Sequence, residues 1–555
     1  MENNKVRFQR IAAAAFLVLA VPAFAASAAS VSGVVLNDAT NKPIYTAVVT
    51  LSTIGTKPLQ AAVSTDASGA FRFDNVPPGR YHLWAGNYGF QEVAFGAPTP
   101  DRYPAVLVLG AGEVRQGLEL RLRPLGAISG VVLDQNGDPL RNAQIQLLVS
   151  SWVRGKKTMV RRNGTNSDGR GEFRIGGVLA GHYYLSANAQ FSPASETTHP
   201  EVSLGEVQPE LVIVRMWYPN AARMADARPL EVKPGEEIRN VTLEMITTTA
   251  ASVHGHIEAP EGVTAGIQVH FVPDEEGGAG LAGLHMAFSP NGDFFTERLA
   301  PGHYQVVTAL QGSDEYRGVD EVDLRPGPQD VVLHMSKGVA LAGRLQVPGV
   351  TPGDLSQYTV TLLPGEPQWF GRRMLSATPK GDGTFVFPAV TPGVWDIGVH
   401  PIPKGGYVKS MTLGDQDVLT AEMNIGPSTS APLNIVVSGR GGVIAGVVKM
   451  PEDPIADLAG RSSPAILLSP AGRFGDVESF VMVKPAEEGG RYEIRGITPG
   501  SYRIFAFDRL EQGAAHDPDF RARVEPLGKA VEIHEGEQIS LDLDVLPFVS
   551  GEPQQ

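Results

Sequence analysis

Residues 68–83 read SGAFRFDNVPPGRYHL, and this stretch decides the fold. A glycine turn leads to Phe71, apolar and polar residues alternate from Phe71 to Phe73 as they do in a half-buried β-strand, and Val76 closes the strand. Pro78 and Gly79 turn the chain, and a second alternating stretch begins at Tyr81. We therefore expect a β-hairpin whose two strands bury Phe71 and Tyr81 on the same face.

The same pattern occurs five times along the chain. Each copy opens with a strand of aliphatic residues around a glycine, continues with a turn and a first aromatic, and reaches a second aromatic after the same number of positions. In chain order these three landmarks are Gly33, Phe71 and Tyr81; Gly130, Phe173 and Tyr183; Gly255, Phe294 and Tyr304; Gly343, Phe385 and Trp395; and Gly446, Tyr492 and Tyr502. A slip of one residue would turn one apolar set to the solvent, so packing alone explains the constant spacing.

Five copies of domain length predict an all-β chain of tandem, Ig-like β-sandwich domains. The 63 glycines and 43 prolines fit many short strands joined by tight turns. The predicted divisions are a signal peptide at 1–28 and sandwich repeats at 29–125, 126–248, 249–338, 339–438 and 439–555, the last with a C-terminal tail. Because the linkers look short, the repeats are expected to follow one another like beads in a semi-rigid rod.

The first residues have the order of a secretory signal. Lys5, Arg7 and Arg10 precede an apolar run over 11–21, and small residues follow at plausible cleavage sites. No later stretch is long and apolar enough to cross a membrane, so no transmembrane anchor is expected after cleavage. The expected location is the periplasm, the cell surface or the medium. The absence of cysteine excludes disulfides and thiolate metal sites.

These motifs resemble the carboxypeptidase regulatory-like domain, a transthyretin-like (prealbumin-like) sandwich of the carbohydrate-binding-like fold group found in exported bacterial proteins. The resemblance is best in repeats 1 and 2, where the stretch from Thr165 to Leu185 is close to the family pattern. It is looser in repeats 3 to 5, where Trp395 replaces the usual tyrosine, and Ala180 replaces a proline in repeat 2. The resemblance implies a fold rather than an activity.

Catalytic chemistry finds no support in the motifs. The zinc-peptidase spacing H-E-x-x-H does not occur, and H-x-x-E occurs only from His534 to Glu537, in a glycine-containing turn rather than a helix. No nucleophile elbow appears, and the glycine pattern G-x-G-x-x-G occurs only at 278–283, where no helical pattern follows it. His254 and His256 share one strand face and are interpreted as a solvent-facing pair rather than metal ligands. Asp66, Asp168 and Asp382 are interpreted as turn caps rather than calcium ligands. We therefore expect no catalytic residues, no metal and no cofactor, and the net charge of −14 argues against a nucleic-acid partner.

The candidate ligand site lies in repeat 2, where aromatics outside the repeat pattern accompany a basic patch. Aromatic rings on a surface can stack against sugars, and the patch could attract an acidic glycan or a partner protein. The candidate residues are Trp152, Arg154, Lys156, Arg161, Trp217 and Tyr218.

The resulting function hypothesis is a noncatalytic exported binding or scaffold protein, with a glycan or an envelope or extracellular protein as partner. Two alternatives stay open. The chain could be an accessory, regulatory-like component of a peptidase or other hydrolase system, or a periplasmic subunit of a larger envelope complex.

Overall fold

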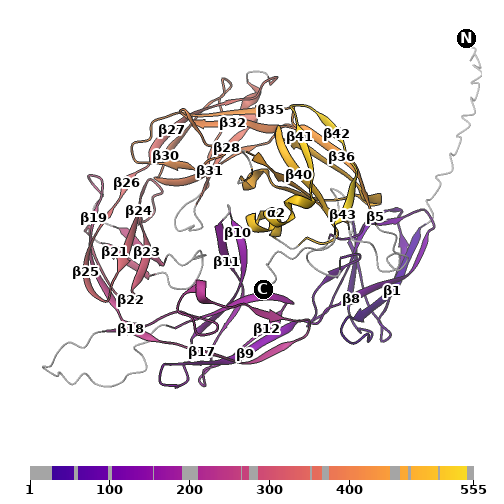
Figure 1. Cartoon of the computed structure of the whole chain (residues 1–555), viewed down its shortest axis with the longest axis horizontal. Helices are drawn as coiled ribbons and strands as arrows, with labels where there is room; N and C mark the ends of the chain where they lie inside the picture. Colours follow the sequence, from indigo (N-terminus) through magenta and orange to yellow (C-terminus); the bar gives the residue numbers. More distant parts are fainter. Residues whose placement is uncertain are drawn as a thin grey trace, which may run out of the picture.

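The computed structural model confirms an all-β chain of tandem β-sandwiches, which follow one another round a ring (Figure 1). It describes residues 28–54, 60–97, 103–153, 156–189, 210–263, 266–273, 285–289, 291–350, 353–365, 374–450, 463–472, 475, 477–510 and 513–546. The predicted signal peptide falls almost wholly outside these residues.

Repeats 1 to 4 each contain two sheets, and the first sheet is built round the strand that opens the repeat. Repeat 5 has the same two sets of strands, but its last strand pairs with both sets and joins them into one eight-stranded sheet. The opening strand pairs antiparallel with the strand of the first aromatic and parallel with the closing strand of the repeat. In sheet order these strands are β4(Ala70–Val76), β1(Ala29–Asn37) and β8(Val114–Leu122); β12(Glu172–Val178), β9(Gly126–Leu133) and β17(Glu237–Glu244); β22(Asp293–Leu299), β19(Ala251–Glu258) and β25(Gly327–His334); β30(Thr384–Val390), β27(Val339–Gln346), β35(Leu433–Ser438), β32(Tyr407–Leu413) and β33(Gln416–Asp417); and β39(Arg491–Ile497), β36(Gly442–Lys449), β42(Gln538–Ser540) and β43(Leu543–Leu546).

The second sheet, or in repeat 5 the second set of strands, contains the strand of the second aromatic. That strand pairs antiparallel with the second long strand of the repeat. The strands are β3(Gln60–Ser64), β2(Val48–Thr53), β5(Gly79–Gly86), β6(Val93–Ala94) and β7(Leu107–Leu109); β11(Lys156–Asn166), β10(Gln144–Val153), β13(Gly181–Asn188), β15(Met216–Trp217) and β16(Leu230–Val232); β21(His285–Ser289), β20(Ile267–Pro273), β23(Gly302–Leu310), β24(Tyr316–Leu324) and β26(Ser336–Lys337); β29(Leu375–Ala377), β28(Thr359–Pro364), β31(Gly393–His400) and β34(Met423–Ile425); and β38(Met482–Pro485), β37(Ala465–Pro470), β40(Gly500–Phe507) and β41(Lys529–Ile533). Between repeats 2 and 3, β14(Leu211–Ile213) pairs with β18(Thr247–Thr249).

The expected hairpin between the two aromatics is wrong. β4 pairs with β1 in the first sheet and β5 pairs with β2 in the second, so the Pro-Gly turn is a corner that carries the chain from one sheet to the other. Phe71 and Tyr81 are both buried, because they enter the core from opposite sheets. The alternation correctly predicted which residues are buried, but it does not show which strands pair with each other.

The second aromatic also fixes the corner through a hydrogen bond. In every repeat its polar hydrogen is donated to the backbone carbonyl four residues earlier. The bonds are Tyr81 Oη to Pro77 O (2.7 Å), Tyr183 Oη to Leu179 O (3.0 Å), Tyr304 Oη to Ala300 O (2.7 Å), Trp395 Nε1 to Thr391 O (2.9 Å) and Tyr502 Oη to Thr498 O (2.8 Å). Trp395 can replace tyrosine because its indole N–H is also a donor at the end of a large apolar ring.

The opening-strand glycine makes room for the two strands beside it. At Gly130 a Cβ would overlap the backbone carbonyl of Val241 on the closing strand, and at Gly255 it would overlap the ring of Phe294. This landmark and the first aromatic therefore form one packing unit, in which the ring lies over a position without a side chain.

The aspartates of the turns before the first aromatic act as caps, as expected. Asp66 Oδ1 accepts hydrogen bonds from the backbone N–H groups of Ser68 (2.8 Å) and Ala70 (2.9 Å), and Asp168 Oδ1 accepts from Arg170 (2.8 Å) and Glu172 (2.9 Å). The Ser68 hydroxyl and these backbone donors lower the pKa of Asp66.

The expected rod is also wrong, because repeat 5 returns to repeat 1. The backbone N–H of Ser463 donates to the carbonyl of Tyr103 (3.3 Å), and the two residues form an isolated antiparallel bridge. β10 of repeat 2 also contacts η7(Ala514–His516) of repeat 5. Sequence alone shows the short linkers but not the angle at each junction, and the sum of those angles closes the ring.

Candidate functional site

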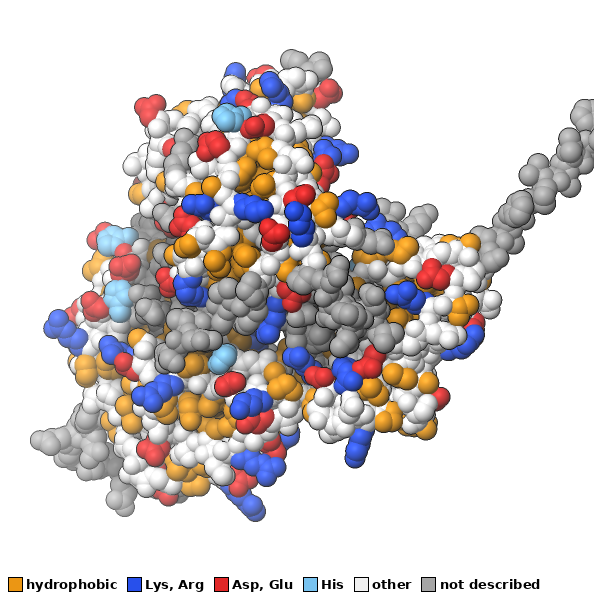
Figure 2. Space-filling model, turned by 45° about the vertical axis from the view of Figure 1, so that its right-hand side comes forward, with side chains coloured by type: hydrophobic (Ala, Val, Ile, Leu, Met, Phe, Trp, Pro, Cys, Tyr) orange, Lys and Arg blue, Asp and Glu red, His pale blue; other side chains and the backbone are white. Residues whose placement is uncertain are grey.

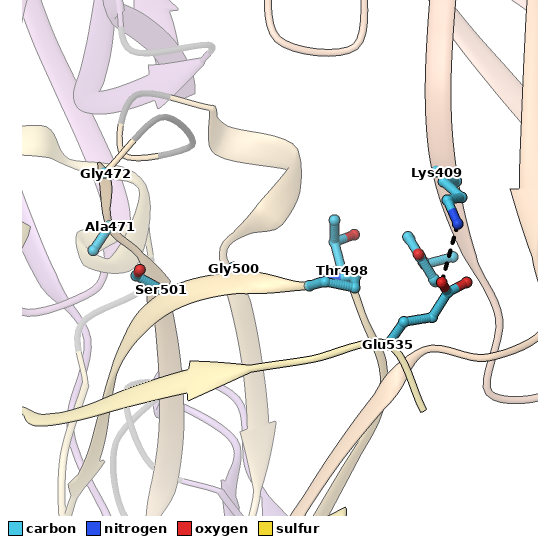
Figure 3. A pocket seen from close by; sticks show the side chains of 9 residues that line it. Lys409, Ala471, Gly472, Thr498, Gly500, Ser501 and Glu535 are labelled. Atoms are coloured by element: carbon cyan, nitrogen blue, oxygen red, sulfur yellow. Dashed lines mark hydrogen bonds and ion pairs between the residues drawn. The ribbon is translucent and has the colours of Figure 1, made fainter. Parts of the chain in front are cut away.

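A pocket of about 420 Å³ lies where repeat 4 meets repeat 5 (Figure 3). Repeat 4 contributes residues of β32, and repeat 5 contributes the end of β37, the corner before β40 and the turn after β41. The lining residues are Tyr407, Lys409, Ala471, Gly472, Thr498, Pro499, Gly500, Ser501 and Glu535.

Glu535 is the centre of the polar network on one side of this pocket. Its Oε1 accepts a hydrogen bond from Ser438 Oγ (2.7 Å), and its Oε2 accepts one from Lys409 Nζ (3.0 Å). The serine hydroxyl and then the lysine ammonium hold the pKa of Glu535 below its ordinary value. The pocket therefore presents an ionised carboxylate and its ammonium partner together, and this ion pair joins the two repeats.

The opposite side of the pocket is a backbone corner held in place by the core. Tyr502 donates its hydroxyl to the carbonyl of Thr498, which fixes the Pro499–Gly500 turn, and Ser501 donates its hydroxyl to Glu532. Tyr407 adds a buried aromatic wall, and burial raises the pKa of its hydroxyl. The site is thus assembled from a recurring structural turn rather than from an added loop.

The arrangement suits a neutral or zwitterionic polar ligand. A hydroxyl group both donates and accepts, and Lys409, Glu535 and Ser501 together offer both roles round one cavity. The volume lies within the range of small-molecule sites in proteins. A single ion pair whose charges already compensate each other favours hydrogen bonding over the binding of an isolated ion.

The structure brings only part of the predicted repeat 2 site into view. Trp152 and Lys156 lie near the tip of the β10–β11 hairpin, where Trp152 pairs with Lys157, but their side chains lie outside the description. Arg154 lies outside the described residues, and Arg161 is exposed on β11. The role of this hairpin in ligand binding stays a prediction.

Trp217 does not offer the exposed ring that was expected. Its side chain is 0% exposed and packs with Leu148, Met159 and Met224 on the face of the sheet away from the main core. Tyr218 is half-buried and packs against the core of repeat 2. The expectation was wrong because the repeat pattern shows only the main core, whereas the segment from β15 through η2(Met224–Asp226) covers the back of the sheet.

The histidine pair lies on an exposed strand face, as expected. His256 Nδ1 is 2.7 Å from Asp293 Oδ1, and the ring of His254 packs against Phe295 with centroids 4.6 Å apart. Among the described residues, no group of three histidines or carboxylates is placed to hold a metal ion. Within the same residues, no helix is long and apolar enough to cross a membrane.

Charge is dispersed on the face shown in Figure 2, where basic and acidic side chains alternate over the surface. That face shows no gathering of lysine and arginine of the kind that tracks a phosphate backbone.

Sequence reasoning missed the junction pocket because its two charged residues belong to different repeats. Lys409 and Glu535 lie far apart in the chain, and neither belongs to a motif. Glu535 lies in the turn that contains Gly536 and precedes the closing strand of repeat 5. Its meeting with β32 depends on the angle between two domains.

Comparison with known proteins identifies the first two repeats. The model of the carboxypeptidase regulatory-like domain matches residues 30–109 and 127–216, which confirms the resemblance. No curated protein matches the chain.

Several solved pilin structures align with parts of the chain. The minor pilin GBS52 of Streptococcus agalactiae aligns at 13% identity and a TM-score of 0.22, covering 40% of this chain and 96% of the pilin. A streptococcal ancillary pilin aligns at 10% identity and a TM-score of 0.20, covering 55% and 98%. The major pilin BcpA of Bacillus cereus aligns at 13% identity and a TM-score of 0.15, covering 56% and 99%.

Proposed function

We propose that this chain, whose first two repeats are carboxypeptidase regulatory-like domains, is a noncatalytic exported protein that binds a polar, hydroxyl-rich ligand such as an oligosaccharide. The observation that carries the proposal is the pocket between repeats 4 and 5, in which Lys409, Glu535 and Ser501 surround one cavity. Export rests on the basic and then apolar order of residues 5–21.

The position of the pocket supports binding rather than catalysis. Its carboxylate is already engaged by a lysine and a serine, and the pKa of Glu535 is lowered, so it is a poor proton acceptor at neutral pH. A charge pair that bridges two domains instead lets a ligand contact both repeats at once. Binding there would tighten the junction, which is a useful property in a scaffold.

The test is binding of the mature protein to a broad glycan array, with variants at both candidate sites. We expect saturable binding that Lys409→Met and Ser501→Ala weaken at least tenfold. Lys380→Met is the matched control, because it removes an exposed lysine from a turn of the same repeat outside the pocket. Binding that only Trp152→Ala abolishes would move the site to the repeat 2 hairpin.

Two further outcomes would contradict the proposal. A folded protein that binds none of the glycans would exclude the oligosaccharide ligand. Hydrolysis of peptide or glycan substrates by the purified protein, or by a hydrolase recovered with it from envelopes, would favour the alternative of a hydrolase component.

A further inference from the structure

Repeat 5 has a second apolar cluster on the back of its sheet. Its helical insertion comprises η7, α2(Pro518–Val524) and η8(Glu525–Leu527). Asp517 caps the N-terminus of α2, and its side chain accepts a hydrogen bond from the N–H of Asp519. The insertion covers β37 and β40 on the face opposite the sandwich core. The buried members of this cluster are Ala465, Leu467, Phe505, Phe507, Leu510, Ala514, Ala515, Phe520 and Val524.

A residue of repeat 1 completes this cluster. Tyr103 packs against it half-buried, and its backbone bridges Ser463, which lies just before β37. Tyr103 lies outside the core cluster of its own repeat. Burial against repeat 5 raises the pKa of its hydroxyl. The side chain therefore serves the contact between repeats and not the fold of repeat 1.

The two halves of this contact, which we call the clasp, lie near opposite ends of the chain. The clasp comprises Tyr103 on repeat 1 and Ser463 with the apolar cluster behind β37 and β40 on repeat 5. Every copy of the protein thus carries both complementary surfaces. A contact between two different surfaces closes into a ring within one chain, but it links chains in series when it forms between copies.

We propose that the clasp is exchangeable, so that Tyr103 of one copy docks on the repeat 5 cluster of a second copy and joins chains head to tail. The inference does not depend on the ligand proposed above. Within one chain, covalent linkage gives the two halves a high effective concentration, which favours the closed ring in dilute solution. Crowding on a surface raises the concentration of competing copies and shifts the balance toward exchange.

Opening the clasp leaves the folded units intact. The cores of repeats 1 and 5 are separate clusters, and neither includes Tyr103. Among the described residues, the clasp consists of one half-buried ring and a backbone bridge, and β10 of repeat 2 adds a contact with η7, whereas each core contains many fully buried side chains. Small rotations at the junctions between repeats can then separate the two surfaces without unfolding a sandwich.

The natural absence of cysteine allows a direct test in the full mature chain. Residues that face each other in an antiparallel bridge have Cα atoms about 4.5–5.5 Å apart, which is within the range that a disulfide spans. One chain carries Tyr103→Cys, and a second chain with a size tag carries Ser463→Cys. The two chains are mixed over a range of concentrations and oxidised.

Exchange predicts a mixed disulfide between the two variants, in excess over both symmetric dimers and increasing with concentration. A mixture of Tyr88→Cys with Ser463→Cys is the matched control, because Tyr88 is a fully exposed tyrosine of repeat 1 away from the bridge. Pro104→Cys with Ser463→Cys repeats the test with the Tyr103 ring retained. The double variant Tyr103→Cys/Ser463→Cys should close within one chain at low concentration.

Two results would overturn the proposal. Closure of the double variant without any excess of mixed disulfide at the highest concentration would show a permanent ring. Failure of the double variant to close would show that the clasp does not form. A cysteine-free readout accompanies the disulfides: sedimentation of the unmodified chain should show concentration-dependent oligomers, and Tyr103→Ser should reduce them at least tenfold.

Discussion

Removing one hydroxyl from the corner of repeat 1 should weaken that repeat by a small, definite amount. In Tyr81→Phe the ring remains buried in the core, and only the bond from Oη to Pro77 O (2.7 Å) is lost. A bond of this kind contributes about 0.5–1.5 kcal/mol net. Pro77 is exposed, so water can replace the hydroxyl at its carbonyl, and the loss should stay within that range.

Two reference variants give the lower and upper limits for the loss of stability in Tyr81→Phe. Tyr88→Phe removes a hydroxyl from a side chain that is 99% exposed, and it should change the free energy of unfolding by almost nothing. Tyr81→Ala removes a buried ring as well, and the loss should approach about 3–5 kcal/mol. The assay is hydrogen–deuterium exchange of peptides from β4 and β5 over a urea series, since that method reports one repeat within the full chain.

The reasoning fails if Tyr81→Phe cannot be distinguished from Tyr88→Phe, because the corner bond would then contribute nothing. It fails equally if Tyr81→Phe is as severe as Tyr81→Ala. Trp395→Phe provides a second test, since it removes the N–H donated to Thr391 O from a corner of repeat 4.

Three further perturbations have defined outcomes. Gly130→Ala should destabilise repeat 2 by at least about 1–3 kcal/mol, because its Cβ overlaps the Val241 carbonyl; chemical denaturation measures the loss. Burial raises the pKa of Tyr492 from 10.0 to about 12. The contribution of its neutral hydroxyl to stability is therefore present below pH 10 and disappears as pH rises toward 12. Tyr492→Phe should flatten this pH dependence when thermal unfolding is measured at alkaline pH. The hydrogen bond to Asp320, and then the charge of Asp320, raise the pKa of His334. The stabilisation of the fold by this interaction is therefore present below pH 6.5 and is lost as pH rises through the raised pKa. His334→Gln should remove this pH dependence from the melting temperature of repeat 3.

The tandem sandwiches could be predicted from the sequence because core packing requires apolar residues at a regular spacing in every repeat. Phe71 and Tyr81 recur at one spacing because both must enter the same core, and Asp66 recurs as a cap because the turn needs an acceptor. The pairing of the strands produces no comparable pattern in the sequence. A corner and a hairpin place the same residues on the buried face, so the alternation round Pro78 could not separate them.

The candidate site was less predictable than the fold. Trp217 lies outside the repeat pattern and was therefore expected on the surface, but a second apolar cluster buries it on the back of the sheet. Lys409 and Glu535 meet only because two sandwiches dock at one particular angle. Tyr103 and Ser463 meet because four such junctions add up to a ring. Contacts of this kind depend on domain geometry, and a single sequence does not show it.

The closed arrangement of the repeats is the central claim, and small-angle X-ray scattering of the mature chain, extrapolated to zero concentration, tests it most directly. A domain of ~100 residues has a radius of gyration of about 13 Å, so five such domains touching in a ring should give between about 24 and 31 Å. The same five domains in line would give about 45–50 Å. A value in the lower range that increases in Tyr103→Ser would agree with the clasped ring. A value near the upper range for the unmodified chain would contradict it.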